Sequence, residues 1–360
     1  MHIDFHHGLT YVVARLAGFN HKEAETVAYC AQYVDESSRE YFLHLYNGTF
    51  HQYMDTSYPV RDKLSRRYLS VFLDALSFGI HQVKKFAEYS IWIPFHFLPG
   101  NNGKSIGETT QDNFFDKLVC TPDSFVAQEM IADCLQDREA PYGLHRLGVA
   151  LHVYADTWSH QGFMGMHHRN NAVAHLSVDT SDDACQNTRL KRICRNLGGR
   201  FAHLFLRYPM GHSAAFSYPD HPCLRWSYRD AKGEMVYRDN PKTYLEAADA
   251  MYRVMLRFRN GDTGIDQTTT LPADARGAIV DCLSSFTSSF KEKRHSQWLK
   301  AIWGDLFGFG SVKLAYKPYD PSLQSELLQR FREAQRIHQK NLLYEILPRF
   351  DISLPIRIIM

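Results

Sequence analysis

The stretch LHVYADTWSH (151–160) carries three side chains that could bind a metal ion. His152, Asp156 and His160 follow one another at a spacing of four residues, which places them on one face of a helix, about one turn apart. The residues between them are mostly apolar, which is typical of a helix that runs through a core. Ionisable groups are costly to bury without partners. The spacing therefore predicts a polar face that binds something, and a divalent metal ion is the leading candidate.

Histidine is abundant in this chain and occurs in clusters. The sequence has 19 histidines in 360 residues, and histidine is the commonest metal ligand in proteins. Ligand-type residues recur in HIDFHH (2–7), YVDES (33–37), PFHFLPG (94–100) and GHSAAFSYPDHP (211–222), which add the candidate ligands His2, His6, Asp35, His96, His212 and Asp220. Mixed imidazole and carboxylate ligands suit Zn²⁺. We therefore predict a site for two or three zinc ions.

Apolar periodicity indicates which elements position these residues. It predicts helices over residues 8–19, 21–39, 60–90, 123–137, 142–164, 241–260, 272–306 and 322–346. Asn47-Gly48 predicts a hairpin over 41–53, and Lys232-Gly233 predicts another over 225–239. Residues 92–103 read as a structured loop, and residues 207–240 as a long irregular insertion. The pattern predicts a mainly α, multi-helix single domain with short β-hairpins.

The predicted domain has two parts. Residues 1–240 hold all the candidate ligands and are expected to form a metal-binding helical catalytic core. Residues 241–360 hold none of them and are expected to pack on that core as further helices, either within the same domain or as a subdomain.

Composition narrows the classes of partner. Charged residues make up 22% of the chain and the formal net charge is +2, so general electrostatic capture of nucleic acid or anionic membrane is not indicated. The most apolar run, residues 69–83, is too short and too polar to span a bilayer. The opening MHIDFHHGLT lacks a basic region followed by an apolar core, and the seven cysteines form no CxxC pair. These features predict reduced thiols and a cytoplasmic protein, although export without a cleavable signal would leave the same pattern.

The LHVYAD pattern with a following His resembles the metal-binding helix of the zinc-dependent phospholipase C/P1 nuclease superfamily. In that family the ligands come, in chain order, from the N-terminus and an early His, an Asp closing an early helix, a His in an HF motif, an H-x-x-x-D helix with a later His, and a final His with a nearby carboxylate. Residues 2–222 present the same order: His2 and His6, Asp35, His96, His152, Asp156 and His160, then His212 and Asp220. The resemblance implies an all-α fold and a three-zinc cluster that hydrolyses phosphate esters.

The first ligand position departs from the family pattern. Members usually begin with a Trp whose free amine and carbonyl bind a zinc ion, whereas here Met1 precedes His2. His2, Asp4 and His6 are the candidates to replace that ligand. The opening MHIDFHHG also resembles the start of an uncharacterised bacterial family, which implies no function.

These residues predict a zinc-dependent phosphoric-ester hydrolase of the phospholipase C or phosphodiesterase type. Zinc ions activate a water molecule and neutralise the charge that develops on phosphate oxygens. Asp156 is expected to bridge two ions, with Asp35, His96 and His152 completing one site and His160 and His212 holding the other. Asp35 and Asp156 are the predicted catalytic residues, because Asp35 could also orient or deprotonate the water. Substrates of three kinds fit: a phospholipid headgroup, a nucleotide or single-stranded nucleic acid, although the lack of a basic stripe disfavours long nucleic acids.

Three alternatives use the same residues differently. A nucleotide phosphohydrolase with an H…HD…D site is disfavoured because the sequence has no adjacent His-Asp dipeptide. A non-enzymatic helical scaffold or binding protein would hold a structural metal ion closed off by four protein ligands, whereas a catalytic ion keeps one position open for water. A haem or di-iron protein would need E-x-x-H motifs on facing helices, and the colour of the purified protein tests it.

Overall fold

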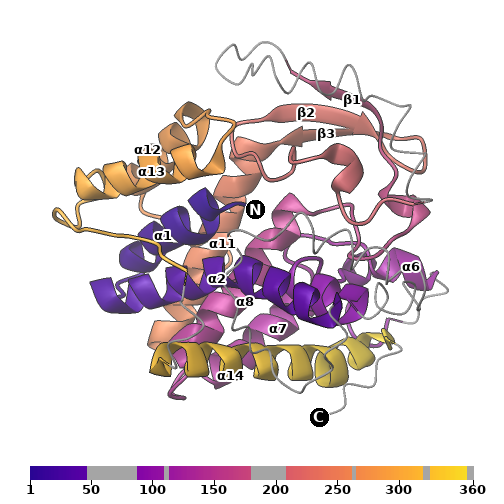
Figure 1. Ribbon diagram of the computed structural model, residues 1–360, viewed down its shortest axis with the longest axis horizontal. Coiled ribbons are helices and arrows are strands. Elements are labelled where there is room, and N and C mark those ends of the chain that lie inside the picture. The colour runs from indigo at the N-terminus through magenta and orange to yellow at the C-terminus, as the bar shows by residue number, and fades with distance from the viewer. Residues whose placement is uncertain (47–86, 109–112, 180–207, 262–264, 319–324, 355–360) are drawn as a thin grey trace.

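The computed structural model is mainly helical, with a small three-stranded antiparallel sheet (Figure 1). It describes residues 1–46, 87–108, 113–179, 208–261, 265–318 and 325–354, and the side chains of these residues except 38–46. The α-helices are α1 (Thr10–Leu16), α2 (His21–Tyr46), α5 (Ile93–Phe95), α6 (Phe114–Lys117), α7 (Phe125–Gln136), α8 (Gly143–Ser159), α11 (Asn240–Asn260), α12 (Ala273–Ser285), α13 (Lys291–Trp303) and α14 (Glu326–Asn341). The strands are β1 (Ala174–Val178), β2 (Arg225–Arg229) and β3 (Met235–Asp239).

Short helical segments of other types complete the described fold. Three are π-helical: η1 (Asp4–Leu9), η2 (Glu88–Trp92) and η7 (Leu342–Ile346). Four are 3₁₀-helical: η3 (Asn101–Gly103), η4 (Arg169–Asn171), η6 (Ser213–Ala215) and η8 (Leu347–Phe350). π-helical turns are rare and often occur at functional sites. Two of them here, η1 and η2, hold or directly precede candidate ligands.

Helix α8 is the central element of the fold. Apart from Leu144, all its residues are buried, and α2, α7, α11 and α14 pack around it (Figure 1). Gly148 allows the closest approach, because a Cβ there would lie 2.6 Å from both the Val27 carbonyl oxygen and the Cys30 Cβ. The sequence therefore brings the backbones of α2 and α8 together one turn before the first ligand of α8.

The sheet lies at one end of the helical body (Figure 1). The predicted hairpin over 225–239 is confirmed: β2 pairs with β3, and the Asp230 carboxylate accepts hydrogen bonds from the backbone N–H groups of Lys232 and Glu234. Gly233 has φ +90° there, which suits glycine. Strand β1, which pairs with β2, was not predicted from the sequence. It is short and largely exposed, so it lacks the regular apolar alternation that identifies a strand.

Three of the predicted elements need correction. The hairpin prediction over 41–53 is wrong for residues 41–46, which continue α2, and residues 47–53 lie outside the described part of the chain. The six-residue run YFLHLY fits either a strand or a helix, and an existing helix is extended at little cost. The loop predicted from residue 92 begins only after α5.

The single helix predicted over 272–306 is two helices, α12 and α13, separated at residues 286–290. Ser and Thr are frequent around this break, in SSFTSS (284–289), and their side chains compete with the backbone for helical hydrogen bonds. The last long helix begins at Glu326, after the cap residue Ser325, whose hydroxyl accepts a hydrogen bond from the Leu328 N–H. The start signal predicted at residues 320–322 lies outside the described residues.

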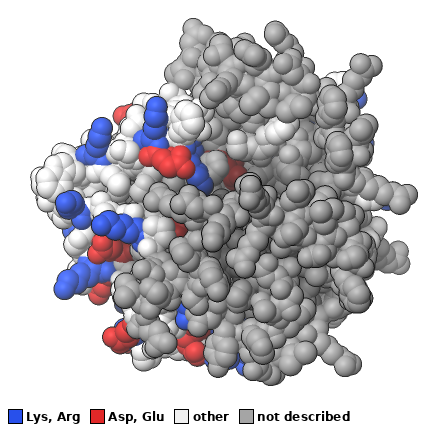
Figure 2. Space-filling model, in the orientation of Figure 1, with Lys and Arg blue, Asp and Glu red and all other residues white. Residues whose placement is uncertain are grey.

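The described part of the chain also shows how surface charge is distributed and whether a helix could cross a membrane. On the face shown in Figure 2, the side chains that are not grey have Lys and Arg interspersed with Asp and Glu. Among the described residues, no helix combines the length and hydropathy that a bilayer crossing requires. Cys30, Cys120, Cys134 and Cys282 are free and buried.

Cys223 is disulfide-bonded. The expectation that the thiols are reduced is therefore wrong for this residue. Disulfide pairing depends on tertiary proximity rather than on any spacing that the sequence displays.

His338 on α14 gives the fold a testable acid sensitivity. Its Nδ1 accepts from Arg146 at 2.7 Å and its Nε2 donates to the Pro94 carbonyl at 2.9 Å. Burial, helped by the Arg146 charge, lowers the pKa of His338 to about 3. The unfolded imidazole binds a proton near pH 6.5 and the folded one does not, so stability is full above pH 6.5 and falls as the pH drops towards 3, by about 1.4 kcal/mol per pH unit.

We expect His338→Gln to remove this contribution to the acid slope. Between pH 7 and pH 5, the free energy of unfolding of the unsubstituted protein should fall by about 2 kcal/mol more than that of the variant. Urea unfolding at several pH values measures the difference. The exposed His175 provides the control, since His175→Gln should keep the original slope. Equal slopes for the unsubstituted protein and His338→Gln would contradict the prediction.

Candidate metal centre

The buried face of α8 and the residue that follows it form the middle of a polar cluster. His152 Nε2 lies 3.4 Å from Asp156 Oδ2, and His160 Nδ1 lies 3.7 Å from the same oxygen. Asp156 is 1% exposed and His152 is fully buried. The four-residue spacing thus brings all three side chains to one place, as the sequence indicates.

Three groups of side chains meet around this face. In each group the potential ligand atoms lie within 4.8 Å of one another. The groups are Asp35, His96 and His152; His6, His152 and Asp156; and His160, His212 and Asp220. The first two share His152, and His160 Nδ1 of the third lies 3.7 Å from Asp156 Oδ2 of the second. The groups therefore form one continuous cluster, to which α2, α8, η1 and two loops contribute.

The group that contains Asp35 connects α2 to the loop after α5. His96 Nδ1 lies 3.9 Å from Asp35 Oδ1, 3.5 Å from Asp156 Oδ2 and 3.3 Å from His152 Nε2. Asp35 has 25% of its side chain exposed, against 1% for Asp156. The cluster is therefore most accessible to solvent on the side of α2.

Backbone carbonyls orient three of the imidazoles. A carbonyl can only accept, so the ring nitrogen facing it carries a proton, and in a neutral ring the other nitrogen keeps a lone pair. The Nδ1–H groups of His152, His160 and His212 donate to the carbonyls of Ala31 (2.7 Å), His96 (2.6 Å) and Phe216 (2.8 Å) respectively. In each case Nε2 then faces a carboxylate of the cluster. Metal-binding histidines are usually held in this way.

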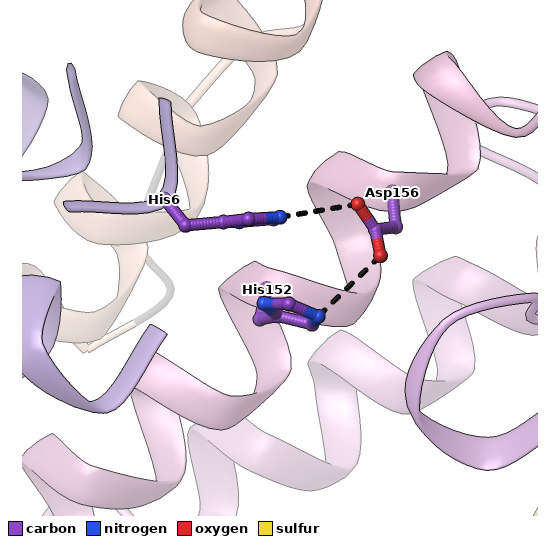
Figure 3. Close-up of side chains that lie close together, drawn as sticks. All are labelled: His6, His152 and Asp156. Atoms are coloured by element: carbon purple, nitrogen blue, oxygen red, sulfur yellow. Dashed lines mark ion pairs between the residues drawn. The ribbon is translucent and has the colours of Figure 1, made fainter. Parts of the chain in front are cut away.

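His6 reaches the cluster from η1 (Figure 3). Figure 3 shows His6 and His152 on either side of the Asp156 carboxylate, and their rings stack with centroids 3.9 Å apart. His6 Nε2 lies 3.2 Å from Asp156 Oδ1, yet neither ring nitrogen makes a hydrogen bond within the described residues. A buried imidazole without hydrogen bonds is unusual, and a bound cation would satisfy it.

The carboxylates of the cluster are ionised. Burial opposes ionisation, but the nearby imidazoles and the Met1 amine hold the pKa of Asp156 and of Asp220 well below the usual range. The pKa of Asp35 is also lowered, against the effect of burial, chiefly by the charge of His152. The cluster therefore gathers negative charge in the interior, where a cation is the natural partner.

Burial opposes the protonation of two imidazoles near these carboxylates. Burial lowers the pKa of His6 to about 3, and it lowers the pKa of His96 as well. His212 is the exception, because Asp220 raises its pKa despite burial. Ionised carboxylates and neutral imidazoles are the protonation states that metal ligands require.

The Met1 amine also lies within the cluster. It is fully buried, 2.5 Å from Asp156 Oδ1 and 3.2 Å from Asp220 Oδ1, and it donates to Ser159 Oγ at 3.3 Å. Burial alone would lower its pKa, but the two carboxylates raise it to about 11. In this arrangement the ammonium group provides positive charge at the centre of the carboxylates.

The three candidates for the first ligand position are now distinguished. His6 belongs to a group, whereas Asp4 pairs with Arg294 at 2.6 Å. His2 is in none of the three groups, and its Nδ1 accepts a hydrogen bond from Arg294 Nη2 at 3.1 Å. Burial lowers the pKa of His2 and the charge of Asp220 opposes this, so His2 lies near the cluster without joining a group.

Arg238 on β3 is a supporting residue that the sequence analysis missed. Its guanidinium donates to the carbonyls of Trp158 and Ser159 at 3.0 Å. These carbonyls belong to the last turn of α8, where a cation is favourable, and His160 follows directly. No local pattern marks Arg238, since it comes from a strand far along the chain.

The arrangement could hold divalent cations. Among the described residues each group offers three protein ligand atoms, whereas an ion such as zinc takes four or more ligands, so water could complete the coordination. Neighbouring groups could hold more than one cation.

Comparison with known proteins gives a family but no activity. The chain matches DUF6765, described as a family of unknown function, over residues 1–351. No curated protein and no solved structure matches the chain. Because the match spans nearly the whole sequence, the protein belongs to the family of unknown function DUF6765.

Proposed function

We propose that this protein is a metal-dependent hydrolase of phosphate esters, with zinc as the metal. The observation that carries the proposal is the orientation of His152, His160 and His212. Each donates its Nδ1–H to a backbone carbonyl and turns its Nε2 towards a carboxylate of the cluster. Metal-binding histidines are typically fixed through one ring nitrogen in this way, so that the other nitrogen can bind the ion.

The residues also fit the chemistry of zinc. Imidazole nitrogens and carboxylate oxygens are common zinc ligands, and His6 has no hydrogen-bond partner of its own within the described residues. Bound zinc ions would acidify a water molecule and neutralise charge on the phosphate oxygens. The order of ligands along the chain, together with the three groups, supports a phospholipase C/P1 nuclease-like centre.

Different side chains would then have different tasks. Asp156 lies between the groups, so its two oxygens would hold two ions in place. Asp35 is the most exposed carboxylate of the cluster, so it is placed to accept a proton from the attacking water. His160, His212 and Asp220 would complete the second site at the other end of α8.

A catalytic centre explains the geometry better than a structural metal site. A structural zinc ion is normally enclosed by four protein ligands, whereas each group has three among the described residues. Three neighbouring groups are also unnecessary for a single structural ion. These features favour hydrolysis over the alternative of a helical scaffold.

Hydrolysis of bis(4-nitrophenyl) phosphate tests the proposal. We expect purified protein to release nitrophenolate, to lose at least about 90% of this activity in a chelator, and to recover it with Zn²⁺, because the ions activate the nucleophile. Elemental analysis should show two or three zinc ions per chain. Zinc-loaded protein without activity on any phosphate ester would contradict the proposed function.

A matched pair of variants on α8 provides the control. His152→Ala should lose both metal and activity. His145, also buried on α8, belongs to none of the three groups, so His145→Ala should keep both. Loss of metal in the two variants alike would indicate general damage to the helix.

The substrate class is resolved by three parallel assays. Phosphatidylcholine vesicles, a single-stranded oligonucleotide and a nucleoside monophosphate all present a phosphate ester, but they differ in the group attached to it. We propose that the preferred substrate is a small or flexible ester, since Lys and Arg are interspersed with Asp and Glu among the coloured side chains of the face in Figure 2, whereas a protein that binds a long polyanion typically has a basic stripe.

A further inference from the structure

The N-terminal ligand segment is held by a helix from the other end of the chain. Segment η1, which carries His6, packs against α13. The contacts come from three residues on one side of α13, namely Arg294, His295 and Trp298, which we call the α13 clamp. None of these three residues belongs to the metal-ligand groups.

Arg294 makes the strongest contacts of the clamp. It is fully buried, and its guanidinium pairs with both Asp4 oxygens, at 2.6 and 3.3 Å. Its other N–H groups reach the Ser288 carbonyl at 2.7 Å and His2 Nδ1 at 3.1 Å. One planar side chain therefore fixes two residues of the N-terminal segment, in a geometry that matches a guanidinium fork.

The other two clamp residues hold the next turn of η1. His295 Nε2 lies 2.9 Å from His7 Nδ1. A Cβ added to Gly8 would lie 2.9 Å from the Trp298 Cβ, so the backbone of η1 and α13 are in close contact there. Residues on both sides of His6 are thus bound to α13, while His6 itself points to α8 (Figure 3).

We propose that Arg294 is a positioning residue for the metal centre, and that the α13 clamp keeps the His6 ligand in place. This gives a role to the C-terminal helices, which supply none of the ligands. It deepens the proposed function and rests on it for the metal, but the clamp itself is a claim about the N-terminal segment. Without the Arg294 contacts, η1 would be free to leave the cluster.

Metal content of Arg294 variants tests the proposal. We expect Arg294→Met to bind one ion fewer per chain than the unsubstituted protein while keeping the ions of the other groups. Substitution with cobalt gives a spectroscopic signature, because the visible bands of the ion near His6 should disappear and the remaining bands should stay. Arg294→Lys keeps a positive charge near Asp4 but not the two-pronged guanidinium geometry. Its metal content per chain should therefore lie between those of Arg294→Met and the unsubstituted protein.

Hydrogen exchange of metal-free protein gives a second readout. Amides of residues 4–9 should exchange at least tenfold faster in Arg294→Met, while those of α2 and α8 keep their rates. Arg146 is the matched control, since it is also fully buried and bonds to His338 and a carboxylate. Arg146→Met should keep every ion and speed exchange around α7 and α14 instead.

The outcomes separate the clamp from the proposed function. If the unsubstituted protein binds no metal, the proposed function fails. The amide exchange rates of residues 4–9 in Arg294→Met and in the unsubstituted protein still show whether the α13 clamp holds the N-terminal segment. Arg294→Met with original metal content and exchange would overturn the proposal, as would an equal loss of that ion in Arg146→Met. If Arg294→Met does not fold, Arg294→Lys and Asp4→Asn carry the same test.

Discussion

Asp156→Asn should reduce phosphodiester hydrolysis by about 10³-fold, the upper end of what one electrostatic contact contributes. Asp156 Oδ1 lies 3.2 Å from His6 Nε2 and Asp156 Oδ2 lies 3.5 Å from His96 Nδ1, so one carboxylate contacts side chains of two groups. An amide keeps the shape but loses the charge that would bind two cations. We therefore expect the variant to lose at least two ions per chain, measured by elemental analysis beside the activity assay.

The control for this substitution is another buried aspartate. Asp249 on α11 is 6% exposed and accepts hydrogen bonds from the Leu271 N–H and from Arg276, and it belongs to none of the metal-ligand groups. Asp249→Asn should keep its zinc and its activity, although it should unfold more easily. Full zinc content in Asp156→Asn would remove the central assignment of the site.

Gly148→Val should destabilise the protein by about 3 kcal/mol, the cost of severe overpacking. The added carbons would overlap the Val27 carbonyl oxygen and the Cys30 Cβ, so α2 would have to move away from α8. That movement would also break the 2.7 Å hydrogen bond from His152 to the Ala31 carbonyl. We therefore expect a large loss of metal affinity together with the loss of stability, measured by thermal unfolding and zinc titration.

Gly277 on α12 is the comparison for this prediction. A Cβ there meets no atom within 4 Å, so Gly277→Ala should be neutral or stabilising by up to about 1 kcal/mol. A stable, zinc-loaded Gly148→Val protein would show that α2 and α8 do not need their close approach.

Much of the fold could be predicted from periodicity, and the errors have physical causes. Helices α7, α8 and α11 have long apolar patterns, and α11 also ends at Gly261 with a left-handed φ of +78°. The sequence signals were ambiguous where segments are short, as in the six residues that end α2. Strand β1 is largely exposed and lacks the alternation of apolar and polar residues that identifies a strand, so only its pairing with β2 defines it.

Part of the candidate site could also be predicted from the sequence, and part could not. Residues of α8 could be identified because helical spacing alone aligns them. The outcome for His2 was different: it lies four residues before the candidate ligand His6, but it bonds to Arg294 of α13 and joins none of the three groups. The support that Arg238 gives to the end of α8 was equally invisible, since no local rule connects a strand residue to a helix so far away in the chain. Long-range contacts therefore decide which of several nearby histidines belong to the cluster.

The contact between η1 and α13 can form only after both segments have been synthesised. At about 5–20 residues per second, on the order of tens of seconds separate the emergence of His6 from that of Arg294. Throughout that time the candidate ligand His6 has no α13 to hold it. From the proposed metal centre and the α13 clamp together, we expect ion uptake at His6 to follow the synthesis of α13, and truncated chains that lack α13 to bind one ion fewer.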